Sequence, residues 1–313
     1  MTESSDLRTV VLVGIPGLED FYSWILGFFC LLYLLSLFGN FILILLIRTD
    51  ESLQIPMYDL VSMLAIADLG LSLATIPTVL GVFSFQSMEL PVPLCLLQMF
   101  FIHSFSVMES SILLAMSYDR FVAICNPLRY PSLLTRHLTR RLGLLTVLRS
   151  FAVILPIPVM VQTSRLCRSA MLSHAFCLHP DIMRLLCSKS TENNIYSMFA
   201  VISTMGLDAF LILLSYALIL RAVFQLSLVS ARWKVFRTCV RHISAVLLFY
   251  IPMISLSMIH RFAGPSSTFL HVPLAYLHFL LPPTLNPILY GMKTKMIYQS
   301  LIHSLRWASK NMV

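Results

Sequence analysis

The sequence predicts an all-α membrane protein in which seven transmembrane helices form one bundle. The chain of 313 residues is 58% hydrophobic and only 12% charged, whereas soluble domains are about 25% charged. Its apolar residues also gather in long runs, and a helix needs about 20 such residues to cross a bilayer. These two observations exclude an ordinary soluble fold.

Seven apolar stretches follow one another along the chain, each long enough for one crossing. We expect them at residues 22–48, 57–84, 96–118, 141–162, 196–226, 238–260 and 271–292. An odd number of crossings places the two ends of the chain on opposite sides of the membrane. We therefore expect one domain over 1–313, with a short outer segment at 1–21 and a tail at 293–313 that forms a short amphipathic helix.

The basic residues set the expected orientation. The formal net charge is +8, and most Lys and Arg fall on one side of the seven-span arrangement. The positive-inside rule makes that side cytoplasmic and the N-terminus extracellular. The excess charge suits anionic lipid, and no aromatic residues alternate with it as they would in a nucleic-acid surface. Membrane lipid is an expected partner and nucleic acid is not.

Four of the seven cysteines fall outside the membrane in this topology: Cys95, Cys167, Cys177 and Cys187. Oxidising conditions there favour disulfides over zinc. Four cysteines allow three pairings, and spacing alone does not choose among them.

A charged pair, Asp119–Arg120, ends the third apolar stretch on the cytoplasmic side. Its charges alone leave two interpretations open. The pair is a switch that faces a partner-binding cavity, or Arg120 extends to lipid phosphates with Asp119 beside it.

The wider set of motifs resembles the rhodopsin-like G-protein-coupled receptors along the whole chain. Four markers stand in the expected order: FGN (38–40), LAIADL (64–69), DRF (119–121) and NPILY (286–290).

Within that superfamily the chain resembles the olfactory receptors, and more specifically their fish-like group, class I. The olfactory motifs are PMY (56–58), MSYDRFVAICNPLRY (116–130), SY (215–216), KVFRTCVRH (234–242), FY (249–250) and PPTLNPILYGMKTK (282–295). The fish-like group is indicated by GIPGLED (14–20), MFFIH (99–103) and HAFCLHPDIMRLLC (174–187).

This resemblance implies a plasma-membrane receptor for a small-molecule odorant that activates a heterotrimeric stimulatory G protein and raises cAMP. It implies two disulfides, Cys95 with Cys177 and Cys167 with Cys187, which staple a lid over the pocket. It also implies a G-protein switch formed by Asp119, Arg120, Asn286, Pro287 and Tyr290. No nucleophile–base pair or phosphate-binding glycine loop occurs in the sequence, so we expect no enzyme activity.

Two carboxylates at bilayer depth, Asp68 and Glu109, match the positions at which the family is thought to hold a sodium ion in the inactive bundle. Two neighbouring acids resist ionising together unless a cation neutralises them. The alternative is that one of them is protonated and hydrogen-bonded. Arg149 and Asp208 are further charges at this depth, and each either pairs with a neighbouring span or extends to the interface.

The odorant pocket is expected in the outer half of the bundle, beneath the cysteine-rich loop. His103 and Ser106 share one face of the third span, and Ser257 and Arg261 share one face of the sixth. Arg261 either anchors a ligand carboxylate through its paired donors or binds a loop acid at the helix end. The first interpretation predicts an organic acid as ligand, and a neutral polar odorant bound by His103 and Ser106 is the alternative.

The chain departs from the family at several positions. Arg237 and Arg241 stand where the sixth-span motif generally has small or polar residues, and Asp59 is an unusual charge in the second span. Pro180 falls where near relatives often offer the ligand a polar side chain. No Asn-x-Ser/Thr site for glycosylation occurs in the sequence, although receptors of this kind usually carry one near the N-terminus.

Two other functions fit a bundle of this kind. One is a receptor for a non-odorant metabolite or a peptide outside the nose. The other is a transporter in which the membrane acids relay protons or sodium, although such proteins usually have paired halves with broken helices, and no internal repeat occurs here.

Overall fold

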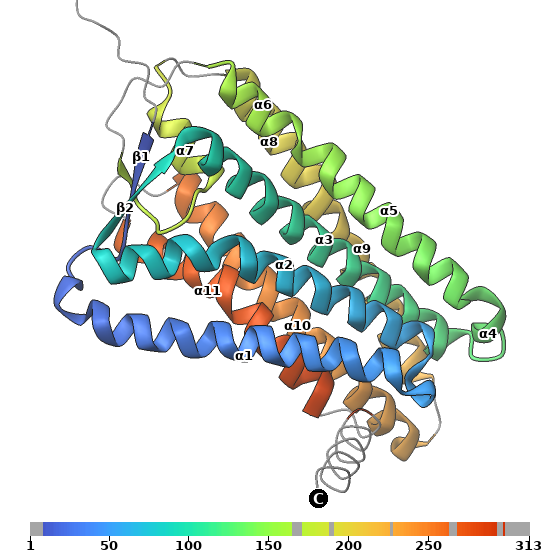
Figure 1. Ribbon diagram of the computed structural model, residues 1–313. Helices are drawn as coiled ribbons and strands as arrows, with labels where there is room; N and C mark the ends of the chain where they lie inside the picture. The colour runs from blue at the N-terminus through green and yellow to red at the C-terminus, as the bar shows by residue number, and fades with distance from the viewer. Residues whose placement is uncertain are drawn as a thin grey trace, which may run out of the picture.

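The computed structural model describes residues 9–164, 171–187, 191–225, 228–262, 268–292 and Ile297. The predicted tail helix within 293–313, Cys167 and the side chain of Arg261 lie outside this description. Figure 1 shows the long helices side by side as a bundle, with β1, β2 and α7 at one end and α4 at the other.

The long helices follow the order of the predicted apolar stretches. They are α1 (Tyr22–Thr49), α2 (Pro56–Phe85), α3 (Val92–Cys125), α5 (Arg136–Ile154) continued by α6 (Pro156–Gln162), α8 (Thr191–Val201) continued by α9 (Leu207–Phe224), α10 (Val229–Phe262) and α11 (Thr268–Pro287). Within the described residues, six of these helical segments are long and apolar enough to span a membrane.

The seventh predicted stretch, 271–292, forms α11 and the single π-helical turn η5 (Ile288–Met292). It packs against α1, α2 and α10 as a member of the bundle. It contains His271 and His278 together with four prolines. The expected bundle of seven helices is confirmed.

Local chemistry explains where several helices begin. Pro56 is in the first turn of α2, where its missing N–H leaves no backbone bond unmade. Thr135 caps α5 by accepting a hydrogen bond from the Leu138 N–H at 3.2 Å. Pro156 opens α6, so α5 and α6 form one continuous path divided at a proline.

Large apolar side chains cover the outside of the bundle. Trp24 and Phe38 on α1, Leu144 on α5 and Leu213 on α9 are all more than half exposed. In water such a surface is an aggregation liability, whereas in lipid it costs nothing. This surface fits a protein that crosses a membrane several times.

A small sheet covers the end of the bundle that carries the disulfide. β1 (Thr9–Val13) lies between β2 (Ser87–Pro91), with which it is antiparallel, and β3 (Met171–Leu172), with which it is parallel. Val10 and Leu12 are buried, as the alternation of a strand requires. The sequence analysis predicted no strand, and the sheet ties the N-terminal segment to the loops before α3 and after α6.

The short helix α7 (His179–Leu185) lies in the same loop region, and α4 (Tyr130–Leu133) lies at the opposite end. Two 3-10 turns, η1 (Glu19–Phe21) and η2 (Glu51–Leu53), flank α1, and a π-helical turn, η3 (Ile202–Gly206), joins α8 to α9. We call the end with the sheet the disulfide end, and the other the Arg120 end.

Candidate functional site: a roofed pocket and a charged cavity

A pocket of about 540 Å³ lies inside the bundle at the disulfide end. Residues of α3, α5, α6, α7, α8, η3, α10 and α11 line it. Most of these side chains are apolar, such as Ile154, Met205, Leu256 and Phe279. None of the described lining residues is Asp, Glu, Lys or Arg, so its polar groups are hydroxyl, amide and imidazole groups.

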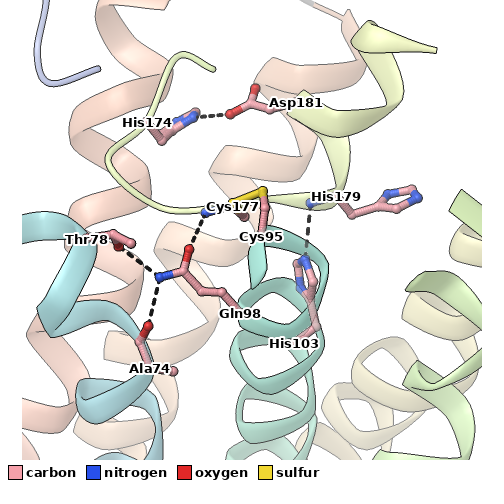
Figure 2. The surroundings of a disulfide bond; sticks show 9 residues. All are labelled: Ala74, Thr78, Cys95, Gln98, His103, His174, Cys177, His179 and Asp181. Atoms are coloured by element: carbon pink, nitrogen blue, oxygen red, sulfur yellow. Dashed lines mark hydrogen bonds and ion pairs between the residues drawn. A yellow bond between two sulfur atoms is a disulfide. The ribbon is translucent and has the colours of Figure 1, made fainter. Parts of the chain in front are cut away.

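Three of the four predicted ligand residues line this pocket: His103, Ser106 and Ser257. The hydroxyl of Ser106 donates to the Ile102 carbonyl at 3.0 Å. His103 Nε2 accepts from the His179 N–H at 3.4 Å (Figure 2). That bond requires an unprotonated Nε2, which leaves Nδ1 as the proton-bearing nitrogen of the neutral ring.

The fourth, Arg261, belongs to α10 one turn beyond Ser257, and its side chain lies outside the described residues. The sequence analysis missed other polar groups of the pocket, among them His179, Asn194, Thr204 and His278. Helical spacing from His103 or Ser257 does not reach them, because they come from other elements. Pro180 also lines the pocket, as its loop position suggested.

The loop segment 171–187, which lines the pocket through residues such as Leu178 and His179, is here called the roof, and it is bonded to α3. Cys95 and Cys177 form the predicted disulfide, with their Cα atoms 5.5 Å apart. Gln98, one turn after Cys95, accepts from the Cys177 N–H at 2.9 Å. Its amide nitrogen donates to the Ala74 carbonyl and the Thr78 hydroxyl, both at 2.8 Å (Figure 2). The Gln98 side chain thus joins the roof, α3 and α2. The sequence analysis did not predict this role, although Gln98 follows Cys95 by one helical turn.

The second predicted disulfide is described in part. Cys187 is disulfide-bonded, and its predicted partner, Cys167, lies outside the described residues. Cys30, Cys125 and Cys239 are free.

A buried acid–base contact braces the roof itself. His174 Nδ1 and Asp181 Oδ2 are 2.5 Å apart. Burial raises the pKa of Asp181, but the hydrogen bond and charge of His174, with help from His271 and Arg184, outweigh burial and leave this pKa below its ordinary value. The carboxylate form of Asp181 therefore stabilises the folded roof. Among the described residues, no group of three or more His, Cys, Asp or Glu side chains could hold a metal ion.

Below the pocket, the two acids of the predicted sodium site are both buried and interact with each other. Asp68 accepts from the Asn286 amide at 3.2 and 3.0 Å. Glu109 Oε1 is buried without a hydrogen-bond partner among the described residues. This orphaned oxygen beside a second carboxyl suits a small hard cation, and a shared proton is the other way to relieve the repulsion.

Arg149 and Asp208 pair across two helices, which answers a question that the sequence left open. Arg149 Nη1 lies 2.9 Å from Asp208 Oδ1. Ser110 and Ser111 donate to Asp208 Oδ2 at 2.9 and 3.1 Å, and the Tyr250 hydroxyl lies 2.7 Å from that of Ser110. This network joins α3, α5, α9 and α10 in the middle of the bundle.

At the Arg120 end, three of the five predicted switch residues line a second cavity of about 290 Å³. Asp119, Arg120 and Tyr290 line it. Asp119 accepts a hydrogen bond from the Tyr130 hydroxyl at 2.8 Å, and no ion pair joins it to Arg120 in the described part of the chain. Successive residues on a helix point in different directions, so direct pairing of these two neighbours is disfavoured.

The remaining motif residues hold α11 against α1 and α2. A Cβ added to Gly39 would lie 2.9 Å from the Cβ of Pro287, so the glycine permits the close approach of the two helices. Asn40 donates to the Pro283 carbonyl at 2.8 Å.

The unusual charge of the second span, Asp59, is also paired, because Arg136 Nε lies 3.0 Å from its Oδ2.

A bundle of membrane-spanning helices with a roofed apolar pocket at one end and a charged cavity at the other defines a membrane receptor. Comparison with known proteins narrows the class. A model of the olfactory receptor family matches residues 29–307. Olfactory receptor 51G2 of Homo sapiens is 48% identical over 303 residues, which cover 97% of this chain and 96% of the relative.

Two further relatives agree. Olfactory receptor 51G1 of Homo sapiens is 47% identical, with coverage of 98% and 96%. Olfactory receptor 51E2 of Rattus norvegicus is 46% identical, with coverage of 92% and 90%. The chain belongs to the olfactory receptor family, in family 51 of class I, and is a G-protein-coupled receptor and not an enzyme.

Proposed function

We propose that this receptor lies in the plasma membrane with its N-terminus outside and detects small organic acids. The observation that carries the ligand size is the 540 Å³ pocket, which falls within the range of small-molecule sites, about 300–1,000 Å³. Its apolar wall suits an alkyl chain. A roof fastened by a disulfide and by Gln98 favours a small molecule over a peptide, which needs an open groove.

The acid preference rests on Arg261 and on His103. Arg261 follows Ser257 by one helical turn on α10 and so belongs to the same helix face. A guanidinium there supplies two parallel donors to a carboxylate. The neutral His103 ring keeps its Nδ1–H as a further donor, because Nε2 is engaged by the roof. A neutral polar odorant would use His103 and Ser106 alone.

The ligand class is tested in cells that report cAMP, with straight-chain acids and the alcohols of equal length as paired agonists. The parent receptor should prefer the acids, and Arg261→Lys should lose about tenfold or more in potency because lysine lacks the fork. Ser257→Ala, one turn away, is the matched control and should change potency less. A neutral molecule as best agonist, or an Arg261→Ala receptor with unchanged acid response, would reject the acid proposal.

We propose that signalling runs through a stimulatory G protein that enters the cavity lined by Arg120. The position of these residues supports the proposal. Arg120 and Tyr290 line this cavity, and Asn286, four residues before Tyr290, donates a hydrogen bond to Asp68. A ligand drives the change by binding the open form more tightly than the resting form. Arg120→Ala should reach the surface, measured by antibody labelling, and lose agonist-dependent cAMP, and full signalling from it would remove Arg120 from the mechanism.

The same pocket would serve a metabolite receptor outside the nose, so tissue expression separates that alternative from odour detection. A transporter finds no specific support, since the family is one of receptors.

A further inference from the structure

The cavity at the Arg120 end has an unusual balance of charge. Its described lining contains two guanidinium groups, Arg120 and Arg241, and one carboxylate, Asp119. The positive charges of Arg120 and Arg241 repel each other, and both favour negative charge on the hydroxyls of Tyr58 and Tyr290. Two like charges that line one cavity repel each other, and an anion between them would offset that repulsion.

The carboxylate of the cavity is already engaged. Asp119 Oδ1 accepts from Tyr130 at 2.8 Å, and burial together with the charge of Asp119 raises the pKa of Tyr130, so this phenol stays a donor. Asp119 does not form an ion pair with Arg120 in the described structure. It therefore offsets at most one of the two positive charges, and the lining keeps a net positive charge.

Two buried donor atoms of the cavity have no acceptor in the described part of the chain. They are the hydroxyl of Tyr290, a residue only 4% exposed, and Nε of Arg120. Buried polar groups are nearly always satisfied. An anion with several oxygens would satisfy both donors and offset the positive charge of the lining.

We propose that this cavity binds a phosphate group, held by Arg120 and Arg241 with the Tyr290 hydroxyl as an additional donor. Guanidinium groups match the geometry of phosphate oxygens in paired hydrogen bonds. The cavity volume, about 290 Å³, suits an ion or one headgroup and not a nucleotide chain. Free phosphate and the headgroup of a phosphoinositide share this chemistry. The site does not depend on the ligand class proposed for the roofed pocket.

The chain supplies a charge-matched control. Arg237 precedes Arg241 by one turn of α10 and carries the same charge, but it is exposed and does not line the cavity. Replacing either arginine with glutamine removes one positive charge from the same end of the same helix. Only Arg241→Gln removes a proposed ligand, so a general effect of surface charge affects both variants equally.

The test uses the full-length chain in phosphatidylcholine nanodiscs, with thermal unfolding followed by the reaction of a thiol dye with Cys239, which is buried when folded. One arm adds inorganic phosphate against sodium chloride of equal ionic strength. The other replaces part of the lipid with phosphatidylinositol bisphosphate, against phosphatidylserine of equal total charge. A bound anion raises the unfolding midpoint by mass action, and we expect a rise of about 2–4 °C in the parent and in Arg237→Gln.

Arg241→Gln should show no rise in either arm, and Tyr290→Phe a smaller one. If Arg241→Gln does not fold, Arg241→Lys decides, because lysine keeps the charge, loses the fork and should weaken the phosphate response about tenfold. A response in the soluble arm alone identifies free phosphate, and one in the lipid arm alone identifies a headgroup. Equal shifts in Arg241→Gln and the parent, or no shift in either arm, would overturn the proposal.

Discussion

The two cavities of this receptor lie at opposite ends of one helix, α3, and differ in what they do with charge. The pocket at the disulfide end has no Asp, Glu, Lys or Arg among its described lining residues, and His103 and Ser106 are bound to backbone atoms of the protein. The cavity at the Arg120 end collects two arginines and leaves buried donors unmet. The first is arranged to recognise shape with a few polar contacts, and the second to hold an anionic or protein partner.

Breaking the Cys95–Cys177 disulfide is expected to have the largest effect. This bond supports the roofed pocket and not the cavity at the Arg120 end. Cys95→Ser should cost about 2–5 kcal/mol of stability and remove the folded receptor from the surface. Surface labelling checks this loss, with Cys30→Ser, a half-buried free cysteine, as control. Normal surface levels of Cys95→Ser would show that Gln98 and the sheet hold the roof without the disulfide.

Breaking the ion pair of Arg149 and Asp208, which lies between the two cavities, is expected to have the next largest effect. Arg149→Leu leaves Asp208 buried with only two serine donors, and losing hydrogen bonds to a charged group costs about 1.5–3 kcal/mol each. The Arg149 side chain is 32% exposed, so solvent screening places the cost at the low end. The midpoint of thermal unfolding measures it. The double variant Arg149→Leu with Asp208→Asn should recover part of the loss, and no recovery would indicate lost packing in place of an unpaired charge.

The acid pair sharpens the comparison because it lies between the pocket and the switch. If a cation bridges Asp68 and Glu109, Glu109→Gln removes one ligand, raises basal cAMP and abolishes the effect of sodium on it. The measurement compares basal cAMP in membranes with sodium or with a larger monovalent cation at equal ionic strength. An unchanged sodium response would show that a shared proton is the better account of the two acids.

The smallest effect is a pH dependence confined to the roof. The pKa of Asp181 is lower in the folded state than in the unfolded chain, so its contribution is complete above the ordinary pKa of about 4 and is lost as pH falls through the folded-state pKa. Thermal stability of the parent should therefore fall more steeply below pH 4 than that of Asp181→Asn. Parallel curves for the two proteins would show that Asp181 does not couple to acid stability.

The helices were predictable and the contacts between them were not. Runs of about 20 apolar residues specify a membrane helix locally, so the predicted stretches agree with the long helices of the bundle. The pairing of Arg149 with Asp208 joins residues 59 positions apart, and local periodicity does not report such distances. The strands of two to five residues escaped for the same reason, because each depends on a distant partner. The Cys95–Cys177 bond was foreseen only through the family resemblance.

The sequence identified the proposed ligand and switch residues, but it did not identify the residues to which they are hydrogen-bonded. The sequence placed Asp119 beside Arg120, whereas Asp119 accepts its hydrogen bond from Tyr130, the first residue of α4. Single-domain organisation of residues 1–313 and the roles of the site residues remain predictions.

The sheet at the disulfide end has a practical consequence for handling this protein. The strand Thr9–Val13 is the shared partner of both other strands, so this strand is part of the folded structure at the disulfide end. Epitope tags and export sequences should be fused ahead of Thr9, and a chimera that exchanges the first 21 residues for those of another receptor should also exchange Ser87–Pro91 and Met171–Leu172.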